Sequence, residues 1–164
     1  MRLARILKHL VTPGWMARRA FPASALRGIE KAINASEREH RGELRFAVEA
    51  GLPLQFLGTN TRKRAEALFS DLRVWDTEEN SGVLIYVQLI DRRIEIVADR
   101  GIAAKVDQAE WDAVCRAMEK QFRQRKFLDG ALEAIETVTR ILARHFPPRG
   151  PNPNELPDKP VVLR

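Results

Sequence analysis

Hydrophobic and polar positions change their period several times along the chain, and these changes predict alternating strands and helices. Leu44, Phe46 and Val48 alternate with charged residues, which is the two-residue period of a strand over positions 43–49. Residues 82–90 are almost all apolar, as in a central strand covered on both faces. Asp91 and Arg92 then predict a tight turn into a third strand over 93–99. Because that turn reverses the chain, the predicted sheet is mixed.

Helical spacing of apolar residues predicts the remaining elements. The segments are residues 1–11, 24–39, 59–72, a helix that begins at Asp107, and residues 128–145. Asp107 with Glu110 three positions later has the pattern of a capping box at the start of its helix. The order of strand, helix and strand between positions 43 and 90 is that of a βαβ unit. The sequence therefore predicts an α/β fold.

The 164 residues suit one domain with two tails. Residues 1–20 are predicted to be a basic amphipathic arm, residues 21–146 the α/β domain, and residues 147–164 an extended tail. The tail holds six of the chain's nine prolines and ends in the apolar run Pro160 to Leu163. Hydrophobic residues make up 45% of the chain, which is ordinary for a protein with a packed core.

Positive charge is concentrated in the arm. The net charge is +6, and residues 1–19 carry five basic residues and no acidic one. The remaining 23 basic and 22 acidic residues leave the rest of the chain nearly neutral. A nucleic-acid-binding domain would spread its basic excess over the folded body, so nucleic-acid binding is not predicted.

The arm has two interpretations, which the sequence leaves open. Leu3, Ile6, Leu7 and Leu10 lie at helical spacing opposite basic residues. Such a helix either packs on the domain or binds peripherally at a membrane surface. Its apolar run is too short and too charged for a transmembrane segment or a signal peptide, so neither is predicted.

Cysteine and histidine usage excludes several chemistries. The single cysteine, Cys115, cannot form an internal disulfide, which favours a cytoplasmic location. The three histidines have no spacing that places two on one helix face, so a zinc site is not predicted. We expect each histidine to be structural or solvent-facing. There is no glycine-rich phosphate loop and no nucleophile-elbow pattern.

The stretch RVWDTEENSGVLIYVQLIDRRIEIVADRGI resembles the TPM domain family, and short bacterial members share an ending similar to NELPDKPVVL. The resemblance covers about residues 21–146. It implies a three-layer α/β/α sandwich whose central twisted mixed sheet has about four strands and is flanked by helices. Three of those strands are clear from the sequence, and the fourth is not assigned.

What the resemblance implies for function is broad. Some members of the family are described as low-activity acid phosphatases, some bind divalent metal ions, and some assist membrane protein complexes. One fold hosts unrelated functions, so none of these activities transfers by fold alone. Many members also carry signal peptides or membrane segments, which are not predicted here.

Acidic loops supply the candidate chemistry. If the predicted hairpin is correct, the loops on either side of the central strand are neighbours, and they contain Asp76, Glu78, Glu79, Asn80, Asp99, Arg100 and Asp107. Asp76, Glu78, Asp99 and Asp107 offer the oxygen ligands that Ca²⁺ or Mg²⁺ prefers, Asn80 is a further candidate, and Arg100 is placed to bind an anion or phosphate. The alternative interpretation is that these residues are solvated charges, a helix cap and an ion pair.

The turn at the other end of the sheet gives a second pair of candidates. Ligands of open α/β sheets often bind near the carboxyl ends of strands, where this turn lies. The resemblance to the TPM family makes Arg92 a candidate for anion or phosphate binding and Asp91 a further candidate. Turn chemistry with a surface ion pair is the alternative.

We therefore predict a binding or accessory module that binds a divalent cation at the acidic loops and serves an unknown protein partner or the membrane face. The alternative is a low-activity, metal-assisted acid phosphatase that hydrolyses phosphomonoesters. The sequence leaves open whether the chain is an enzyme.

Overall fold

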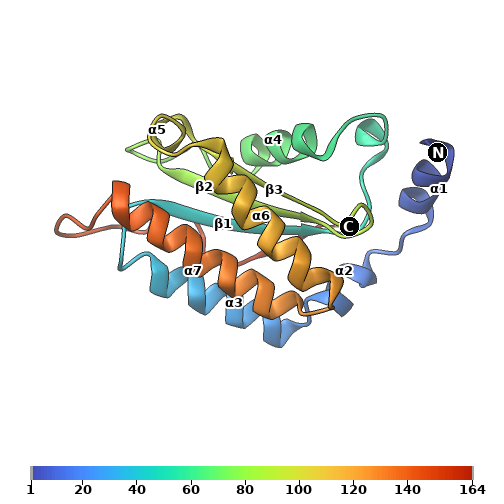
Figure 1. Ribbon diagram of the computed structural model, residues 1–164, viewed down its shortest axis with the longest axis horizontal. Helices are drawn as coiled ribbons and strands as arrows, with labels where there is room; N and C mark the ends of the chain where they lie inside the picture. Colours follow the sequence, from blue (N-terminus) through green and yellow to red (C-terminus); the bar gives the residue numbers. More distant parts are fainter. Residues whose placement is uncertain (1, 164) are drawn as a thin grey trace.

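The computed structural model describes residues 2–163 and has a four-stranded sheet at its centre (Figure 1). The strands are β1 (Glu43–Glu49), β2 (Gly82–Gln88), β3 (Arg93–Ala98) and β4 (Val161–Leu163), in the spatial order β3-β2-β1-β4. β1 is parallel to β2 and β4, whereas β2 and β3 are antiparallel. The predicted mixed sheet is confirmed, with β3 as the antiparallel edge strand.

Helices cover both faces of this sheet (Figure 1). They are α1 (Arg2–Val11), α2 (Trp15–Ala20), α3 (Ala23–Ser36), α4 (Thr61–Asp71), α5 (Arg100–Ala103), α6 (Gln108–Arg123) and α7 (Phe127–His145), with a 3₁₀ turn η1 (Leu54–Phe56) before α4. α3, α6 and α7 pack together on one face, and α4 lies on the other. The predicted α/β fold with flanking helices is confirmed.

The two-residue alternation of side chains along β1 determines which of them pack into each core. Leu44, Phe46 and Val48 pack into the larger core under α3, α6 and α7. Ala47 packs with Leu84 and Tyr86 of β2 into a smaller core beneath α4. Successive side chains of a strand point to opposite faces, so this division follows directly from the alternation in the sequence.

Polar residues on the α4 side of β1 are also buried. The Glu49 carboxylate accepts hydrogen bonds from Arg64 Nη2 of α4 at 2.6 Å and from the Tyr86 hydroxyl at 2.6 Å. Burial alone would lower the pKa of Arg64, but the hydrogen bond and charge of Glu49 outweigh it and raise that pKa. The buried ion pair therefore ties α4 to the two central strands.

The C-terminal tail covers the rest of that face and supplies the fourth strand. Glu43 Oε2 accepts a hydrogen bond from Leu156 N at 3.1 Å, and Arg45 donates to the carbonyl groups of Pro157 and Lys159. The tail then pairs with β1 as β4. Residues 147–160 form neither helix nor strand, and proline, which lacks a backbone N–H, cannot continue a helix.

The start of α6 differs from the predicted pattern, whereas the start of α4 has a side-chain cap. Asp107 occupies the N-cap position of α6, but its side chain makes no capping hydrogen bond, so the predicted capping box is wrong. Glu110 instead pairs with Arg144 of α7 at 3.1 Å. The helix at residue 61 is capped by Asn60, whose side chain accepts from Lys63 N at 2.9 Å.

A helix that crosses a bilayer needs about 20 consecutive, mostly apolar residues. None of the helices within residues 2–163 has the length and apolar character to do so.

Candidate functional site

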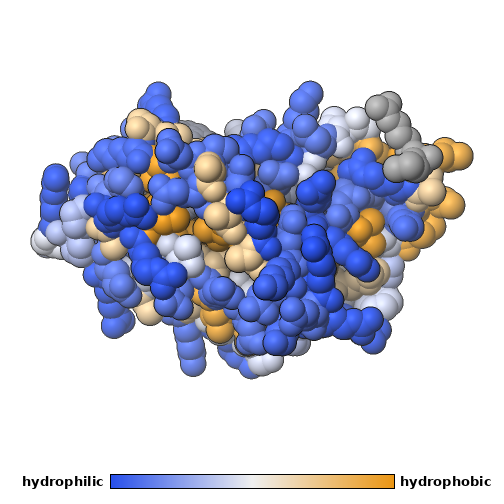
Figure 2. Space-filling model, viewed as in Figure 1, coloured by the Kyte–Doolittle hydropathy of each residue, from blue (hydrophilic) through white to orange (hydrophobic). Residues whose placement is uncertain are grey.

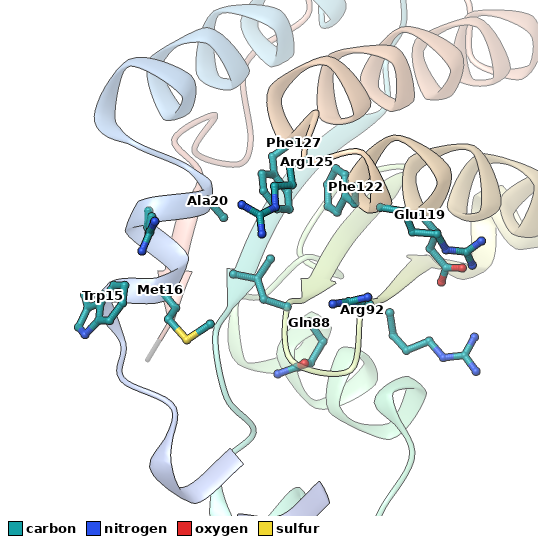
Figure 3. Close-up of a pocket in the computed structure, with 13 residues that line it drawn as sticks. Trp15, Met16, Ala20, Gln88, Arg92, Glu119, Phe122, Arg125 and Phe127 are labelled. Carbon is teal, nitrogen blue, oxygen red and sulfur yellow. The ribbon is translucent and has the colours of Figure 1, made fainter. Parts of the chain in front are cut away.

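A cavity of about 640 Å³ lies at the carboxyl end of β2 (Figure 3). Three separate parts of the chain form its walls: α2, the turn between β2 and β3, and the end of α6 with the start of α7. Its lining is Trp15, Met16, Arg19, Ala20, Gln88, Leu89, Arg92, Arg93, Glu119, Phe122, Arg123, Arg125 and Phe127. The carboxyl edge of parallel strands is where open α/β sheets bind ligands.

Five arginines surround this cavity: Arg19, Arg92, Arg93, Arg123 and Arg125. Within residues 2–163, none of their side chains forms an ion pair or a hydrogen bond with another residue. Glu119 is the single carboxylate among the lining residues. We call this site the arginine cavity. Its like charges repel one another, so an anion that entered would relieve that repulsion.

Local structure explains how the arginines converge. Arg92 has a left-handed backbone (φ 53°) at the end of the turn, and Arg125 has one (φ 60°) in the link between α6 and α7. Arg123 is the last residue of α6 and Arg19 lies in the last turn of α2. Helix carboxyl ends carry partial negative charge, which offsets part of the cost of these positive side chains.

The remaining wall of the arginine cavity is apolar. Phe122 and Phe127 pack edge to face with ring centroids 5.2 Å apart, and Met16 and Leu89 add aliphatic surface. Figure 3 shows Arg125 entering from the helical side and Arg92 from the turn. The cavity thus combines donors for an anionic group with a surface for an apolar one.

Asp91, next to Arg92, binds residues of α1 and does not line the arginine cavity. Its carboxylate accepts hydrogen bonds from Arg5 Nη2 at 2.6 Å and from Arg5 Nε at 2.9 Å, a bidentate pair, and it contacts His9 Nε2 at 3.1 Å. Burial would raise the pKa of Asp91, but the hydrogen bonds from Arg5 and His9 hold it below its ordinary value. Asp91 therefore anchors α1 to the turn that carries Arg92.

His9 is the second residue of α1 that binds Asp91, and both of its ring nitrogens contact the protein. Leu52 N donates to His9 Nδ1 at 3.0 Å, so Nδ1 is the acceptor nitrogen of a neutral ring. Nε2 then carries the proton and donates to Asp91. His40, also buried, accepts from Gly42 N at 3.1 Å, and burial lowers its pKa to about 4. For both residues the structural alternative among our expectations is confirmed.

The acidic loops lie at the opposite end of the sheet and do come together as neighbours. Arg100 Nε donates to Asn80 Oδ1 at 3.1 Å, and Gly101 N donates to the Asn80 carbonyl at 3.1 Å. Asp99 caps α5 by accepting from Arg100 N at 2.7 Å, while its Oδ2 is buried without a partner among the described residues. The hairpin therefore places these loops side by side.

The carboxylates of the predicted metal site are used separately. Asp76 pairs with Arg73 at 2.7 Å, and Glu79 pairs with Arg41. Glu78 and Asp107 are exposed. Within residues 2–163, no group of three or more histidine, cysteine, aspartate or glutamate side chains is arranged to hold a metal ion. A divalent cation at this end remains a prediction.

Of the cavity's arginines, sequence reasoning named only Arg92. The five arginines come from three separate parts of the sequence, and their convergence depends on the packing of α2 and α6 around the turn. One local signal was present, because residues 123–126 read RQRK directly before an aromatic residue.

Comparisons with known proteins agree with this architecture. The family model of the TPM domain matches residues 19–141. A comparison with curated proteins gave no match. The NMR structure of the BA42 protein from the psychrophilic bacterium Bizionia argentinensis is 30% identical, with a TM-score of 0.77, over 86% of this chain and 94% of that one.

Two further NMR structures show the fold alone. The N-terminal domain of a protein from P. gingivalis is 15% identical with a TM-score of 0.64, over 87% of this chain and 97% of that one. The N-terminal domain of a Corynebacterium glutamicum protein is 16% identical with a TM-score of 0.51, over 73% of this chain and 72% of that one. The family match extends over most of the chain and includes both ends of the sheet. The chain belongs to the TPM domain family.

Proposed function

We propose that this chain is a TPM-domain binding module that holds an anionic ligand in the arginine cavity. The observation that supports it is the presence of five arginines without protein partners around one cavity within residues 2–163. Guanidinium groups bind phosphate and carboxylate in a bidentate manner and keep their charge at any physiological pH.

The apolar part of the cavity lining narrows the class of ligand further. Phe122, Phe127, Leu89 and Met16 offer no donors to a fully hydrated ion, so they favour a ligand whose anionic group is attached to an apolar part. A volume of about 640 Å³ lies within the range of small-molecule sites. A phosphomonoester of an aromatic or aliphatic alcohol has this chemistry.

Binding suits the lining better than hydrolysis. The cavity-lining residues include no serine, threonine, cysteine or histidine, and Glu119 is their one carboxylate. A phosphate held there would meet charge but no nucleophile from the lining. This supports an accessory binding role. The single cysteine supports a cytoplasmic location for it.

The test is a calorimetric titration of the purified chain with phenyl phosphate, inorganic phosphate and pyrophosphate. We expect phenyl phosphate to bind more tightly than inorganic phosphate, and we expect binding to weaken as salt is added. The double variant Arg92→Gln/Arg125→Gln should weaken binding about a hundredfold or more, since hydrogen bonds to charged groups contribute about 1.5–3 kcal/mol each.

Two matched variants serve as controls. Arg116→Gln removes an exposed arginine of α6 that does not line the cavity, and Arg38→Gln removes an exposed arginine that follows α3 and does not line it either. Both should bind like the original chain. Equal losses in the controls, or no binding of any of the three anions, would show that the arginine cavity is not the site.

Binding of a divalent cation at the acidic loops is a second candidate function, and one buried oxygen atom supports it. Asp99 Oδ2 is buried without a hydrogen-bond partner in the described part of the chain, beside Asn80 and Arg100. Metal-assisted phosphomonoester hydrolysis would depend on a cation there, with Arg100 near the phosphate. Titration with Ca²⁺ and Mg²⁺ tests this proposal: binding that is lost in Asp99→Asn and in Asp76→Asn supports it, and absence of binding rejects it.

A further inference from the structure

The first helix, α1, turns its apolar side to solvent and its polar side to the domain. The exposed fractions are 81% for Leu3, 60% for Leu7, 53% for Leu10 and 69% for Val11. His9, on the opposite side of the same helix, is buried. Surface helices ordinarily bury the apolar stripe, so this orientation is the reverse of the usual one.

The reversed orientation is fixed by specific contacts. Arg5 and His9 bind Asp91, Arg5 Nη1 donates to the Leu57 carbonyl at 3.1 Å, and His9 accepts from Leu52 N. These partners belong to the β2–β3 turn and to the loop before α4. Because the polar side is held at several points, α1 cannot roll its leucines onto the domain without breaking them.

Neighbouring segments add to the same surface. Leu54 of η1 and Trp15 of α2 are exposed large hydrophobic residues, and Trp15 also lines the arginine cavity. Figure 2 shows apolar side chains at the end of the molecule where Figure 1 places α1. Lys8 and Arg18 are exposed basic residues of α1 and α2. We call this surface, made of α1, Trp15 and Leu54, the apolar end.

We propose that the apolar end docks on an anionic lipid surface, with α1 lying in the plane of the membrane interface and the arginine cavity taking the phosphate of a lipid headgroup. The headgroup part rests on the proposed function. Asp91 and Arg92 are adjacent, so the anchored helix and the cavity are joined through a single turn.

Charge favours lipid over the other occupants of such a surface. Arg5 is neutralised by Asp91, but Lys8, Arg18 and Arg19 are exposed, so two copies of the chain would repel each other if they met at this end. An anionic bilayer offers an apolar layer for the leucines and phosphates for the basic residues at once. Tryptophan is also a preferred residue at membrane interfaces.

The test is flotation of the full chain with vesicles of phosphatidylcholine, alone or mixed in equal parts with phosphatidylglycerol. We expect binding to the anionic vesicles and much weaker binding to the neutral ones. Leu3→Gln/Leu7→Gln should weaken binding to anionic vesicles about tenfold or more. Trp75→Gln is the matched control, because Trp75 is an exposed hydrophobic residue at the acidic end, and it should bind normally.

Folding and the soluble ligand are checked on the same variants. Leu3 and Leu7 face solvent, so the double variant should keep its unfolding temperature and its affinity for phenyl phosphate. Arg92→Gln/Arg125→Gln should lose affinity both for phenyl phosphate and for anionic vesicles. Tryptophan emission should change when vesicles are added to the original chain. If α2 contacts the membrane, Trp15→Phe should reduce this change.

Three outcomes would overturn the inference. The first is absence of vesicle binding while phenyl phosphate still binds, which leaves the proposed function intact. The second is vesicle binding that Leu3→Gln/Leu7→Gln does not weaken. The third is a dimer, seen by light scattering, that the same variant dissociates, because the apolar end would then be covered by a second copy. Failure of phenyl phosphate binding as well would reject the proposed function too.

Discussion

The two ends of the sheet hold their charges in different ways. At the carboxyl end of β2, five arginines surround a cavity and have no partner within the described residues. At the opposite end, Arg41, Arg73 and Arg100 each bind a neighbouring side chain. A charged group satisfied by its own chain stabilises local structure, whereas unsatisfied groups of one sign leave binding capacity for another molecule.

The acidic end also contains buried carboxyl groups whose pKa values are raised. Glu43 is buried beneath the tail, and burial raises its pKa to about 7, with the charges of Glu155 and Asp158 adding to the effect. Burial likewise raises the pKa of Glu37 to about 8, and Glu43 and Asp158 contribute. Burial therefore favours the neutral, protonated form of these two carboxyl groups, whereas arginine keeps its charge.

The largest expected effect comes from filling the close contact that shapes the acidic end. A Cβ added at Gly82 would clash with the Val74 carbonyl oxygen, which is backbone and cannot move aside. Gly82→Ala should therefore destabilise the fold by about 3 kcal/mol or more, as measured by urea unfolding. Gly58→Ala is the control, since a Cβ there meets nothing within 4 Å. Equal stability of the two variants would show that the close approach of Gly82 to Val74 does not constrain the fold.

Releasing the anchor of α1 should have the next effect. Asp91→Asn removes the charge that pairs with Arg5, and we expect a loss of about 1–2 kcal/mol, reduced from the buried-pair value by solvent access to Arg5. Hydrogen exchange should rise in α1 and not in α7. Because the pKa of Asp91 is lowered in the fold, its contribution is present above the unfolded pKa and is lost as pH falls through the folded one. Unchanged exchange in α1 would argue against the anchor.

Protonation at the acidic end gives a smaller effect with the opposite sign. The pKa of Glu43 is raised to about 7 in the fold, so its contribution is present below its unfolded pKa and is lost as pH rises through 7. Glu43→Gln should therefore be more stable than the original chain at pH 8, by about 1 kcal/mol, and its stability should vary less between about pH 5 and pH 8. Thermal unfolding across this pH range measures both. Parallel curves for the two chains would show that Glu43 does not titrate there.

The smallest change in stability is expected at the arginine cavity. Arg92→Gln/Arg125→Gln removes two like charges, and we expect stability to rise by no more than about 0.5 kcal/mol at low salt. Arg116→Gln provides the reference. The comparison between the ends would fail if the double variant were strongly destabilised, because the arginines would then have a structural role.

Much of the fold could be predicted because its strongest signals are local. The alternation at Phe46, the apolar run before Asp91 and the helical stripe of α7 each lie within one element. β4 was not predicted, because three residues carry little pattern and their partner strand lies far earlier in the chain. The burial of Glu43 and Glu49 was also missed, since their covering groups come from the tail and from α4.

The candidate sites were less accessible to such reasoning. Asp91 and Arg92 were chosen because the turn that holds them resembles the family's pattern, but only packing shows that one holds α1 and the other lines the cavity. The apolar stripe of the arm was recognised, whereas its outward orientation depends on the anchor formed by Arg5 and His9. Sequence patterns show which residues are apolar or charged, whereas tertiary contacts determine whether those side chains face the core, a cavity or solvent.

The covering of β1 by the tail has a consequence for the order of folding. Arg45 and Glu43 find their partners 112 and 113 positions later in the chain. During synthesis, β1 therefore leaves the ribosome long before the segment that satisfies its charged residues exists. Until then one edge of β1 is open to solvent, water hydrates its two charged side chains, and the free edge can pair with a strand of another chain.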